Sequence, residues 1–244
     1  RLLAEQHLRA GRPDAEELAA APHNLFGHVD ASIRHSAGDW TKEATAEIAR
    51  ISAAGKVPVI VGGTGLNFTA LTRGLADIPE TPPEIRALAD ARMQAEGRAA
   101  LLAELDAATA ARIDPLNGVR VQRAWEVLHA TGRGLAAWQD ETPAPLLPLA
   151  RAEPLVLVPD VAWLNTRIDR RFDRMIAEGA LEEARANLPG WDPGRPSSRA
   201  IGGPELIAHL RGEMPLQAAI AAATLASRQY AKRQRTWFRS NMLG

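Results

Sequence analysis

Two short, almost wholly apolar runs constrain the fold of this chain more than any other feature. The first is Val-Pro-Val-Ile-Val at residues 57–61, closed at once by two glycines, and the second is Leu-Val-Leu-Val at residues 155–158. Such runs are typical of parallel strands that are covered by helices on both faces. Helical patterns lie before and after them, so the sequence predicts an α/β fold with a parallel sheet.

The residues between the two runs show helical periodicity and no strand pattern. Prolines at positions 143, 145 and 148 mark the end of this part. We therefore expect an α/β core formed by residues 1–77 and 149–244, and a helical insertion formed by residues 78–148. The helices predicted in the insertion are 84–96, 98–113 and 118–130.

Five further helices are predicted in the core. The helix that begins near residue 40 has Asp39 and Thr41 as its candidate N-caps and Gly55 at its end. Asp169 lies on the long third helix, where ion pairs within the helix are the simplest account of its charge. The predicted helices are 14–18, 39–51, 165–187 and 205–210, followed by a last helix from residue 215 to about 240.

Composition excludes several classes of protein. The chain has 244 residues, 46% of them hydrophobic, which suits one large or two small globular domains and excludes a disordered or fibrous chain. The lack of cysteine excludes a disulfide scaffold and a cysteine nucleophile, and it fits the cytoplasm. No window approaches the roughly 18 apolar residues of a membrane span, so we expect no membrane partner. We also expect the protein to be a monomer.

Residues 61–66 (Val-Gly-Gly-Thr-Gly-Leu) have the pattern of an anion-binding turn. A strand that runs into a helix through glycines exposes backbone N–H groups at the helix N-terminus, and Thr64 adds a hydroxyl. The candidate diphosphate ligands are therefore Gly62, Gly63, Thr64 and Gly65. The alternative is a tight turn in which the glycines only supply positive φ. The dinucleotide and Walker motifs are both absent from the chain.

A row of cations lies on the last predicted helix. Arg228, Lys232, Arg235 and Arg239 are spaced i, i+4, i+7 and i+11, which places them on one stripe, and no acid follows Glu213. Because basic and acidic residues balance at 29 each, any binding of nucleic acid must depend on a local patch of this kind. A phosphate backbone or a diphosphate would compensate these charges. The alternative is a solvated helix end that favours cations.

The insertion carries a second basic pair, Arg120 and Arg123. A pair of this kind indicates a binding surface only together with other basic residues. Arg86 and Arg199 are further single cations. The six histidines form neither a His-Glu-x-x-His pair nor an evident cluster of three ligands, so the sequence predicts no metal ion bound by protein side chains.

Several separated segments, in order, resemble the tRNA dimethylallyltransferase family. The longest is the ending Ser-Arg-Gln-Tyr-Ala-Lys-Arg-Gln-Arg-Thr-Trp-Phe-Arg at residues 227–239, which is similar to the C-terminal signature of the family. Arg199 to Gly202 and Pro22-His23 match further landmarks. The other matching segments are 58–66, 78–86, 120–127 and 131–133.

The resemblance implies a P-loop-kinase-like core and transfer of a dimethylallyl group from dimethylallyl diphosphate to N6 of adenosine 37 in tRNA. It implies that Thr64 and Arg199 act on the reacting diphosphate, with Mg²⁺ as an assisting ion, because these groups stabilise charge on the leaving oxygens. It also implies nucleotide binding, including ATP binding, and a target base flipped out of its stack. The residues expected to contact tRNA are Arg86, Arg120, Gln122 and Arg123, together with the cations Arg228, Lys232 and Arg235.

Several positions depart from the family pattern. The Walker-type loop and the following Asp general base of family members have no counterpart here, so we expect a fragment that binds tRNA weakly and has little activity. Smaller departures are Asn24, Asn67 and Gly203-Pro204. Two other functions stay open at this point: a non-catalytic RNA-binding module, which the basic residues alone would satisfy, and a small-molecule phosphotransferase of the P-loop type.

Overall fold

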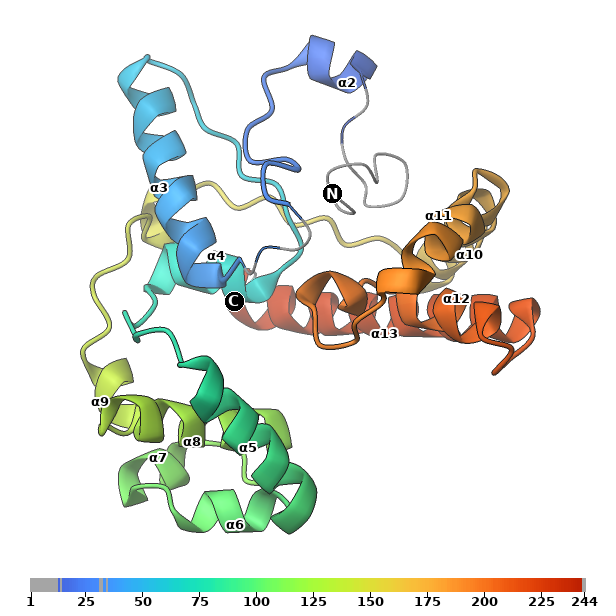
Figure 1. Cartoon of the computed structure of the whole chain (residues 1–244). Coiled ribbons are helices and arrows are strands. Elements are labelled where there is room, and N and C mark those ends of the chain that lie inside the picture. The colour runs from blue at the N-terminus through green and yellow to red at the C-terminus, as the bar shows by residue number, and fades with distance from the viewer. Residues whose placement is uncertain (1–12, 14, 31–32, 34, 243–244) are drawn as a thin grey trace. The chain divides into compact units, whose positions relative to one another are not determined.

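The computed structural model describes residues 13, 15–30, 33 and 35–242 (Figure 1). Contacts divide the chain into two compact units, which are described separately below. Unit 1 comprises residues up to Asn67 together with Glu153–Gly244, and unit 2 is Phe68–Ala152. None of the described helices is both long enough and apolar enough to cross a membrane.

The described elements of unit 1 are helical. The helix α3 begins after Ser36, whose hydroxyl accepts from the Asp39 backbone N–H at 3.1 Å, while the Asp39 carboxylate accepts from the Ser36 N–H at 3.0 Å. The expected caps Asp39 and Thr41 are therefore wrong by one turn, because Ser36 and Asp39 together form a capping box. The elements are α2 (Ala15–Ala20), α3 (Ala37–Ala53), the start of α4 (Gly65–Arg73), α10 (Val161–Ala177), α11 (Ala180–Asn187), α12 (Gly203–Leu210) and α13 (Leu216–Met242), with the 3₁₀ turns η2 (Leu188–Gly190) and η3 (Pro196–Arg199).

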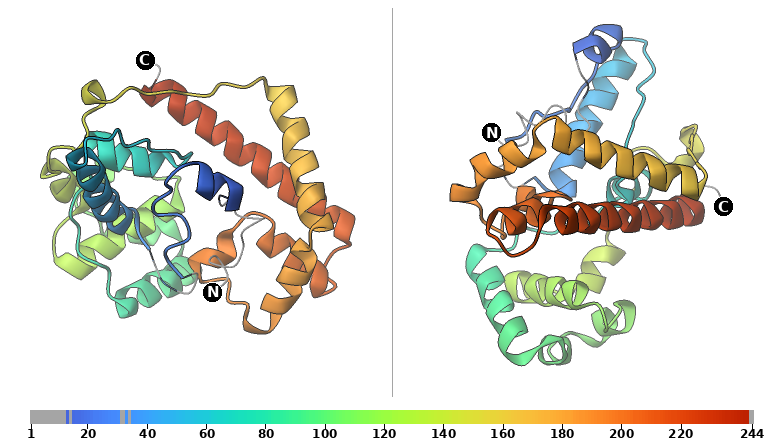
Figure 2. Two further views of the ribbon diagram at one scale, coloured as in Figure 1. Left: turned by 90° about the horizontal axis from the view of Figure 1, so that it is seen from above. Right: turned by 90° about the vertical axis from the view of Figure 1, so that its right-hand side faces the viewer.

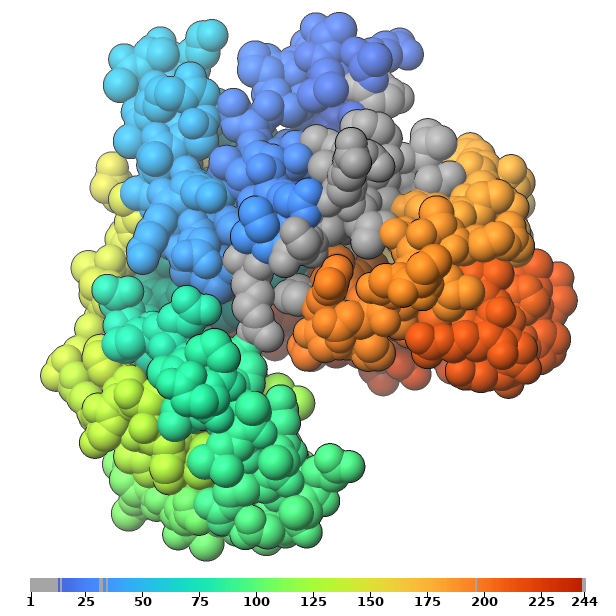
Figure 3. Space-filling model, viewed as in Figure 1, coloured from blue at the N-terminus to red at the C-terminus, as the bar shows by residue number. Residues whose placement is uncertain are grey.

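Small residues allow the long helix α13 to pack closely on its neighbours α10 and α12. Ala219 and Ala223 are fully buried at this contact, where the absence of larger side chains brings the helix backbones together. Figure 2 shows α10 running beside α13, and Figure 3 shows the residues of the last helices, in orange to red, gathered together. A second cluster joins α11 to α12 through Ala180, Ala184, Leu206 and Ile207.

The helix predicted over residues 165–187 is two helices, α10 and α11. Gly179 separates them with φ of 98°, a left-handed conformation that interrupts the helix and that glycine adopts without steric cost. Helical periodicity continues across this residue, so the pattern of apolar side chains conceals the break.

The two predicted strands form no sheet among the described residues. Residues 57–61 and 155–158 have no ladder partner, and most of their side chains are exposed to solvent, with Val57 85% and Leu155 88% exposed. The expected burial of both runs on both faces is therefore wrong for this structure. A parallel strand is stable only with hydrogen-bonded neighbours and a cover of helices, and the described residues supply neither to these runs.

Unit 2 is a bundle built around α8. Val121, Ala124, Trp125 and Val127 of this helix are buried, and α5 and α6 pack on it through Ala89 and Leu101. The Trp125 indole donates to the Glu104 carboxylate at 2.6 Å, which satisfies the only polar atom of the buried ring. The elements are α5 (Pro83–Glu96), α6 (Arg98–Ala103), α7 (Ala107–Arg112), α8 (Gly118–Thr131), α9 (Leu135–Asp140) and η1 (Leu149–Arg151), with most of α4.

Two capping motifs decide where the helices of unit 2 end. The predicted helix over residues 98–113 breaks at Asp106, whose carboxylate accepts from the Thr109 N–H at 2.9 Å and so begins α7. Gly132 ends α8 with φ of 68°, and the Thr131 hydroxyl accepts from the Arg133 N–H at 3.2 Å. The segment 131–133, a landmark in the sequence, is therefore a helix C-cap.

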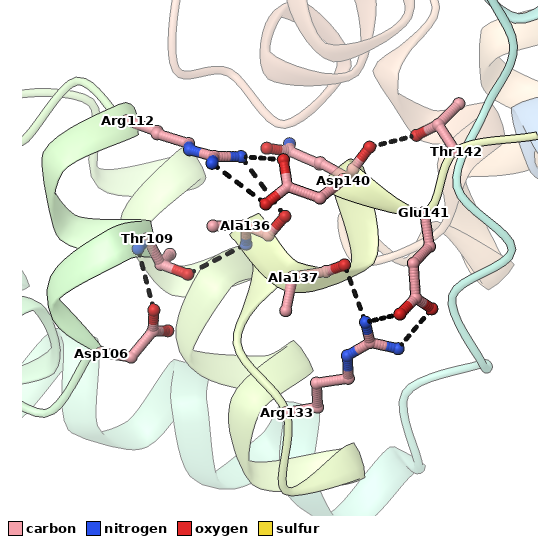
Figure 4. A network of polar contacts seen from close by, with 10 residues as sticks. Asp106, Thr109, Arg112, Arg133, Ala136, Ala137, Asp140, Glu141 and Thr142 are labelled. Carbon is pink, nitrogen blue, oxygen red and sulfur yellow. Dashed lines mark hydrogen bonds and ion pairs between the residues drawn. The ribbon is translucent and has the colours of Figure 1, made fainter.

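Ion pairs join α7, α9 and the segment after α8 (Figure 4). Arg112 binds both oxygens of Asp140, at 2.6 and 3.0 Å, and Arg133 pairs with Glu141. Each guanidinium holds the pKa of its partner carboxyl below the ordinary value, and hydrogen bonding from Thr109 does the same for Asp106. Because the Arg112 and Arg133 pairs are exposed, they fix geometry more than they add stability.

Candidate functional site

The glycine-rich segment 62–65 leads into the N-terminus of α4, as the sequence predicts. Gly62 and Thr64 are exposed, whereas Gly63 and Gly65 are half-buried. None of these three glycines has positive φ, so the alternative in which they only supply that conformation is wrong. Thr64 immediately precedes α4, and its carbonyl accepts from the Asn67 N–H at 3.1 Å, while the first N–H groups of a helix have no partner within it.

Close approach of α13 explains why glycine occupies two of these positions. The Gln234 side-chain amide donates to the Gly63 carbonyl at 2.9 Å, and a Cβ on Gly63 would overlap that amide. A Cβ on Gly65 would lie 2.6 Å from the Trp237 ring. Residues 63–65 and α13 therefore fit together only because these side chains are absent.

We expect Gly65→Ala to destabilise unit 1 by roughly 1–3 kcal/mol, the usual cost of overpacking a well-fitted contact. Urea unfolding would measure the change, with Gly190→Ala as the control because a Cβ there meets no atom within 4 Å. Trp237→Leu should remove much of the clash. The double variant should then lose less stability than the two single variants add up to, and simple additivity would contradict the contact.

A cation-bearing cavity adjoins the glycine-rich segment. It has a volume of about 610 Å³ and its wall is formed by α13, including Lys232, Arg233 and Trp237. Since Trp237 also lies against Gly65, the cavity and the segment share one side chain. Arg233, with its guanidinium 5.6 Å from the Tyr230 ring centroid, is a cation that the stripe spacing misses. The sequence could have indicated Arg233 by its position next to Lys232 in the C-terminal segment that resembles the family.

The row of cations on α13 is not uniform. Arg228 forms an ion pair with Asp169 of α10, so its charge is compensated within the protein. The prediction that Asp169 pairs within its own helix is therefore wrong, and so is the view that only solvent or a polyanion balances Arg228. Within the described part of the chain, Lys232 is exposed, Arg235 is half-buried, and neither side chain has an ion-pair partner.

Arg199 lines a different cavity from the one beside Gly65. This second cavity has a volume of about 300 Å³, and Trp191, Ile207 and Arg211 are also in its wall. The buried Ser198 lies beside Arg199, and the turn before α12 places both. Thr64 lines neither described cavity, so the joint action of Thr64 and Arg199 on one diphosphate stays a prediction.

The basic residues of unit 2 lie on α5 and α8. The Arg123 guanidinium donates to the buried Thr81 hydroxyl at 2.5 Å and lies 3.6 Å from the Glu126 carboxylate. The Gln122 amide donates to Asp90 at 2.6 Å and to Glu126 at 3.1 Å, so these two side chains are fixed by internal partners. Arg120 is exposed and Arg86 is half-buried. The contact of these four residues with RNA stays a prediction.

One cluster of potential ligands is absent from the sequence interpretation. His28, His35 and Glu43 lie together before and within α3, and their ligand atoms are all within 4.8 Å of one another. The sequence marks no three-ligand cluster among the histidines, whereas the fold brings His28 and His35 to Glu43. The expectation that side chains bind no metal ion stays a prediction. No recognised motif has this spacing.

Comparisons with known proteins agree with these observations. The chain matches the IPP transferase family model over residues 6–241. It is 66% identical to the tRNA dimethylallyltransferase of Cereibacter sphaeroides over 96% of this chain and 74% of that protein. It is 59% identical to that of Roseobacter denitrificans over 95% of this chain and 80% of that protein.

Two solved structures are also similar. A tRNA isopentenylpyrophosphate transferase from Bacillus halodurans has a TM-score of 0.62 and 32% identity, covering 99% of this chain and 75% of that one. A eukaryotic dimethylallyltransferase acting on tRNA has a TM-score of 0.77 at 24% identity, covering 95% of this chain and 60% of that one, and its likeness concerns the fold alone. Together with the match over residues 6–241, these results show that the chain belongs to the IPP transferase family.

Proposed function

We propose that this protein transfers the dimethylallyl group of dimethylallyl diphosphate to N6 of adenosine 37, beside the anticodon of tRNA. Family membership and the names of relatives at 59–66% identity support the reaction. The structural observation that carries the proposal is Trp237, which packs against Gly65 and also lines the cavity that holds Lys232 and Arg233. Because Trp237 is common to both, we infer that Lys232 and Arg233 lie close enough to the N-terminus of α4 to bind one diphosphate together with it.

The chemistry explains why such a site is useful. N6 of the adenine attacks C1 of the dimethylallyl group, the C1–O bond breaks, and the diphosphate leaves with the electron pair while N6 loses a proton. Negative charge therefore grows on the leaving oxygens. The Thr64 hydroxyl, the free N–H groups at the start of α4, and the cations of α13 would stabilise that charge.

We propose Mg²⁺ as a companion of the diphosphate and not as an ion held by this site alone. Mg²⁺ is usually held by one or two carboxylates together with substrate phosphates. Residues 62–65 offer one side-chain oxygen, that of Thr64, and no carboxylate. The single three-residue ligand cluster found among the described residues contains two histidines, which suit Mg²⁺ poorly. These donors do not fit a resident Mg²⁺, so no step is assigned to it.

We further propose that residues 57–61 and 155–158 act as strands of a P-loop-kinase-like sheet in the active enzyme. Their exposed valines and leucines support this, because pairing and covering them would remove a large apolar area from water. Hydrogen exchange should then show protected amides at residues 59–61 in the enzyme engaged in transfer. Exchange at the rate of an open chain would contradict the sheet.

The transfer reaction is tested directly with labelled dimethylallyl diphosphate and an unmodified tRNA. In an enzyme that joins this chain to the Walker-type loop and general base of the family, we expect label to appear in tRNA, and to be absent when guanosine replaces adenosine 37, because N6 is then missing. The 244 residues alone should transfer little or none. Tight binding of tRNA with no transfer, under conditions where a relative of this family is active, would contradict the proposal and favour a non-catalytic RNA-binding module.

We expect Arg123→Ala to weaken tRNA binding and to reduce the slope of log affinity against log salt by about one unit. The reason is that one phosphate contact is lost, after Arg123 has exchanged its bonds to Thr81 and Glu126 for an RNA oxygen. Filter binding over a range of salt concentrations would measure the slope. Arg98→Ala, an exposed cation of α6 in the same unit, is the control. Equal slopes for the two variants would remove Arg123 from the interface.

A further inference from the structure

Glu43 of α3 is shared by two histidines that approach it from the preceding segment. The His28 Nε2 lies 2.7 Å from the Glu43 Oε2, and the His35 Nε2 lies 3.1 Å from the same oxygen. His35 immediately precedes Ser36, the N-cap of α3, and the capping box fixes the backbone there. The two imidazole rings are 5.6 Å apart and nearly perpendicular, so both nitrogens face one carboxylate without stacking.

These distances resemble those between ligands of one metal ion. Zn²⁺ lies about 2.0–2.1 Å from imidazole nitrogen and about 2.0–2.2 Å from carboxylate oxygen, so tetrahedral ligands are roughly 3.3 Å apart. The two N–O distances here, 2.7 and 3.1 Å, differ from that spacing by a few tenths of an ångström. An ion could therefore replace the two hydrogen bonds with small movements of the side chains.

The identity of the ligands selects the class of ion. Two imidazoles and one carboxylate suit borderline divalent transition metals and leave at least one coordination position for water. Mg²⁺ and Ca²⁺ prefer all-oxygen sites. The neighbouring carboxylate of Asp39 is occupied by the backbone and hydroxyl of Ser36, so it is not available as a fourth ligand.

We propose that His28, His35 and Glu43 bind one divalent transition metal ion of the Zn²⁺ type. The ion would connect His28 and His35 to Glu43 of α3. This inference is independent of the transfer reaction, since none of the three side chains is assigned to the diphosphate or to RNA.

The test is competition for Zn²⁺ between the full chain and a chromophoric chelator. We expect one Zn²⁺ per chain, a higher melting temperature with Zn²⁺, and no competition from a large excess of Mg²⁺. Glu43→Gln and His35→Gln should each weaken Zn²⁺ binding by at least about 100-fold, since loss of outer-shell partners alone costs 10–100-fold. Circular dichroism of both variants would establish that they fold.

Matched controls come from the same part of the chain. Glu47→Gln removes a carboxylate one turn further along α3 that pairs with Arg50, and His23→Gln removes an imidazole that bonds to the Ala21 carbonyl. Both should keep the affinity for Zn²⁺ and the thermal shift. Zn²⁺ binding that survives in Glu43→Gln and in His35→Gln would be adventitious and would overturn the proposal, as would effective competition by Mg²⁺.

Discussion

Gly202→Ala should lower the free energy of unfolding by roughly 3 kcal/mol or more, because two unfavourable effects add at this position. Gly202 has φ of 97°, a left-handed conformation that costs a residue with a Cβ about 1–2 kcal/mol. The new Cβ would also lie 2.8 Å from the buried Phe172 ring of α10. The melting temperature should fall by roughly 6–12 °C.

Gly212→Ala separates the backbone cost of Gly202→Ala from its steric clash with the Phe172 ring. Gly212 has φ of 78°, and a Cβ there would meet no atom within 4 Å, so only the backbone cost applies. We expect Gly212→Ala to cost roughly 1 kcal/mol in urea unfolding. Equal losses in the two variants would show that the Phe172 ring moves aside freely and that the turn before α12 is loosely packed.

Thr64→Ala should slow dimethylallyl transfer by a factor on the order of ten to a thousand, because the hydroxyl would donate to the leaving diphosphate. The effect should fall on kcat more than on KM, since the charge is greatest in the transition state. Thr64→Ser, which keeps the hydroxyl, should retain most of the rate. Single-turnover kinetics with saturating tRNA would measure the chemical step.

Thr72→Ala is the matched control for Thr64. Thr72 is on the same helix, but its hydroxyl donates to the Phe68 carbonyl at 2.8 Å and is therefore directed to its own backbone. Its removal should leave the transfer rate nearly unchanged. A Thr64→Ala enzyme as fast as Thr72→Ala would remove Thr64 from the site.

Most helices of this chain were predictable, and their interruptions were not. Periodicity indicates α5, α8 and α13 because each places apolar residues on one buried face. Asp106 and Gly179 split two predicted helices, because a cap and a left-handed glycine act locally within a continuing pattern. The short helix α9 lies between Gly134 and the prolines and was missed. The two apolar runs form no strands among the described residues, because an apolar run predicts burial but cannot supply its own partners.

The sequence identified which residues belong to the site better than it identified the contacts that those residues make. The sequence marks Gly63 and Gly65 as special, but only the structure shows that the reason is the approach of Gln234 and Trp237. Helical spacing groups Arg228 with Lys232, although the pair with Asp169 depends on a helix 59 residues away in the chain. Contacts between distant segments have no signature in local spacing.

The Trp237 indole, on the last helix, contacts Gly65 and also lines the cation-bearing cavity. One aromatic ring therefore contributes both to the packing of the C-terminal helix and to the shape of the cation-bearing cavity. Anything that shifts this ring must change both properties at once. Substitutions at Gly65 and Trp237 are therefore expected to be tolerated in pairs that preserve the joint volume, and to be harmful when made alone.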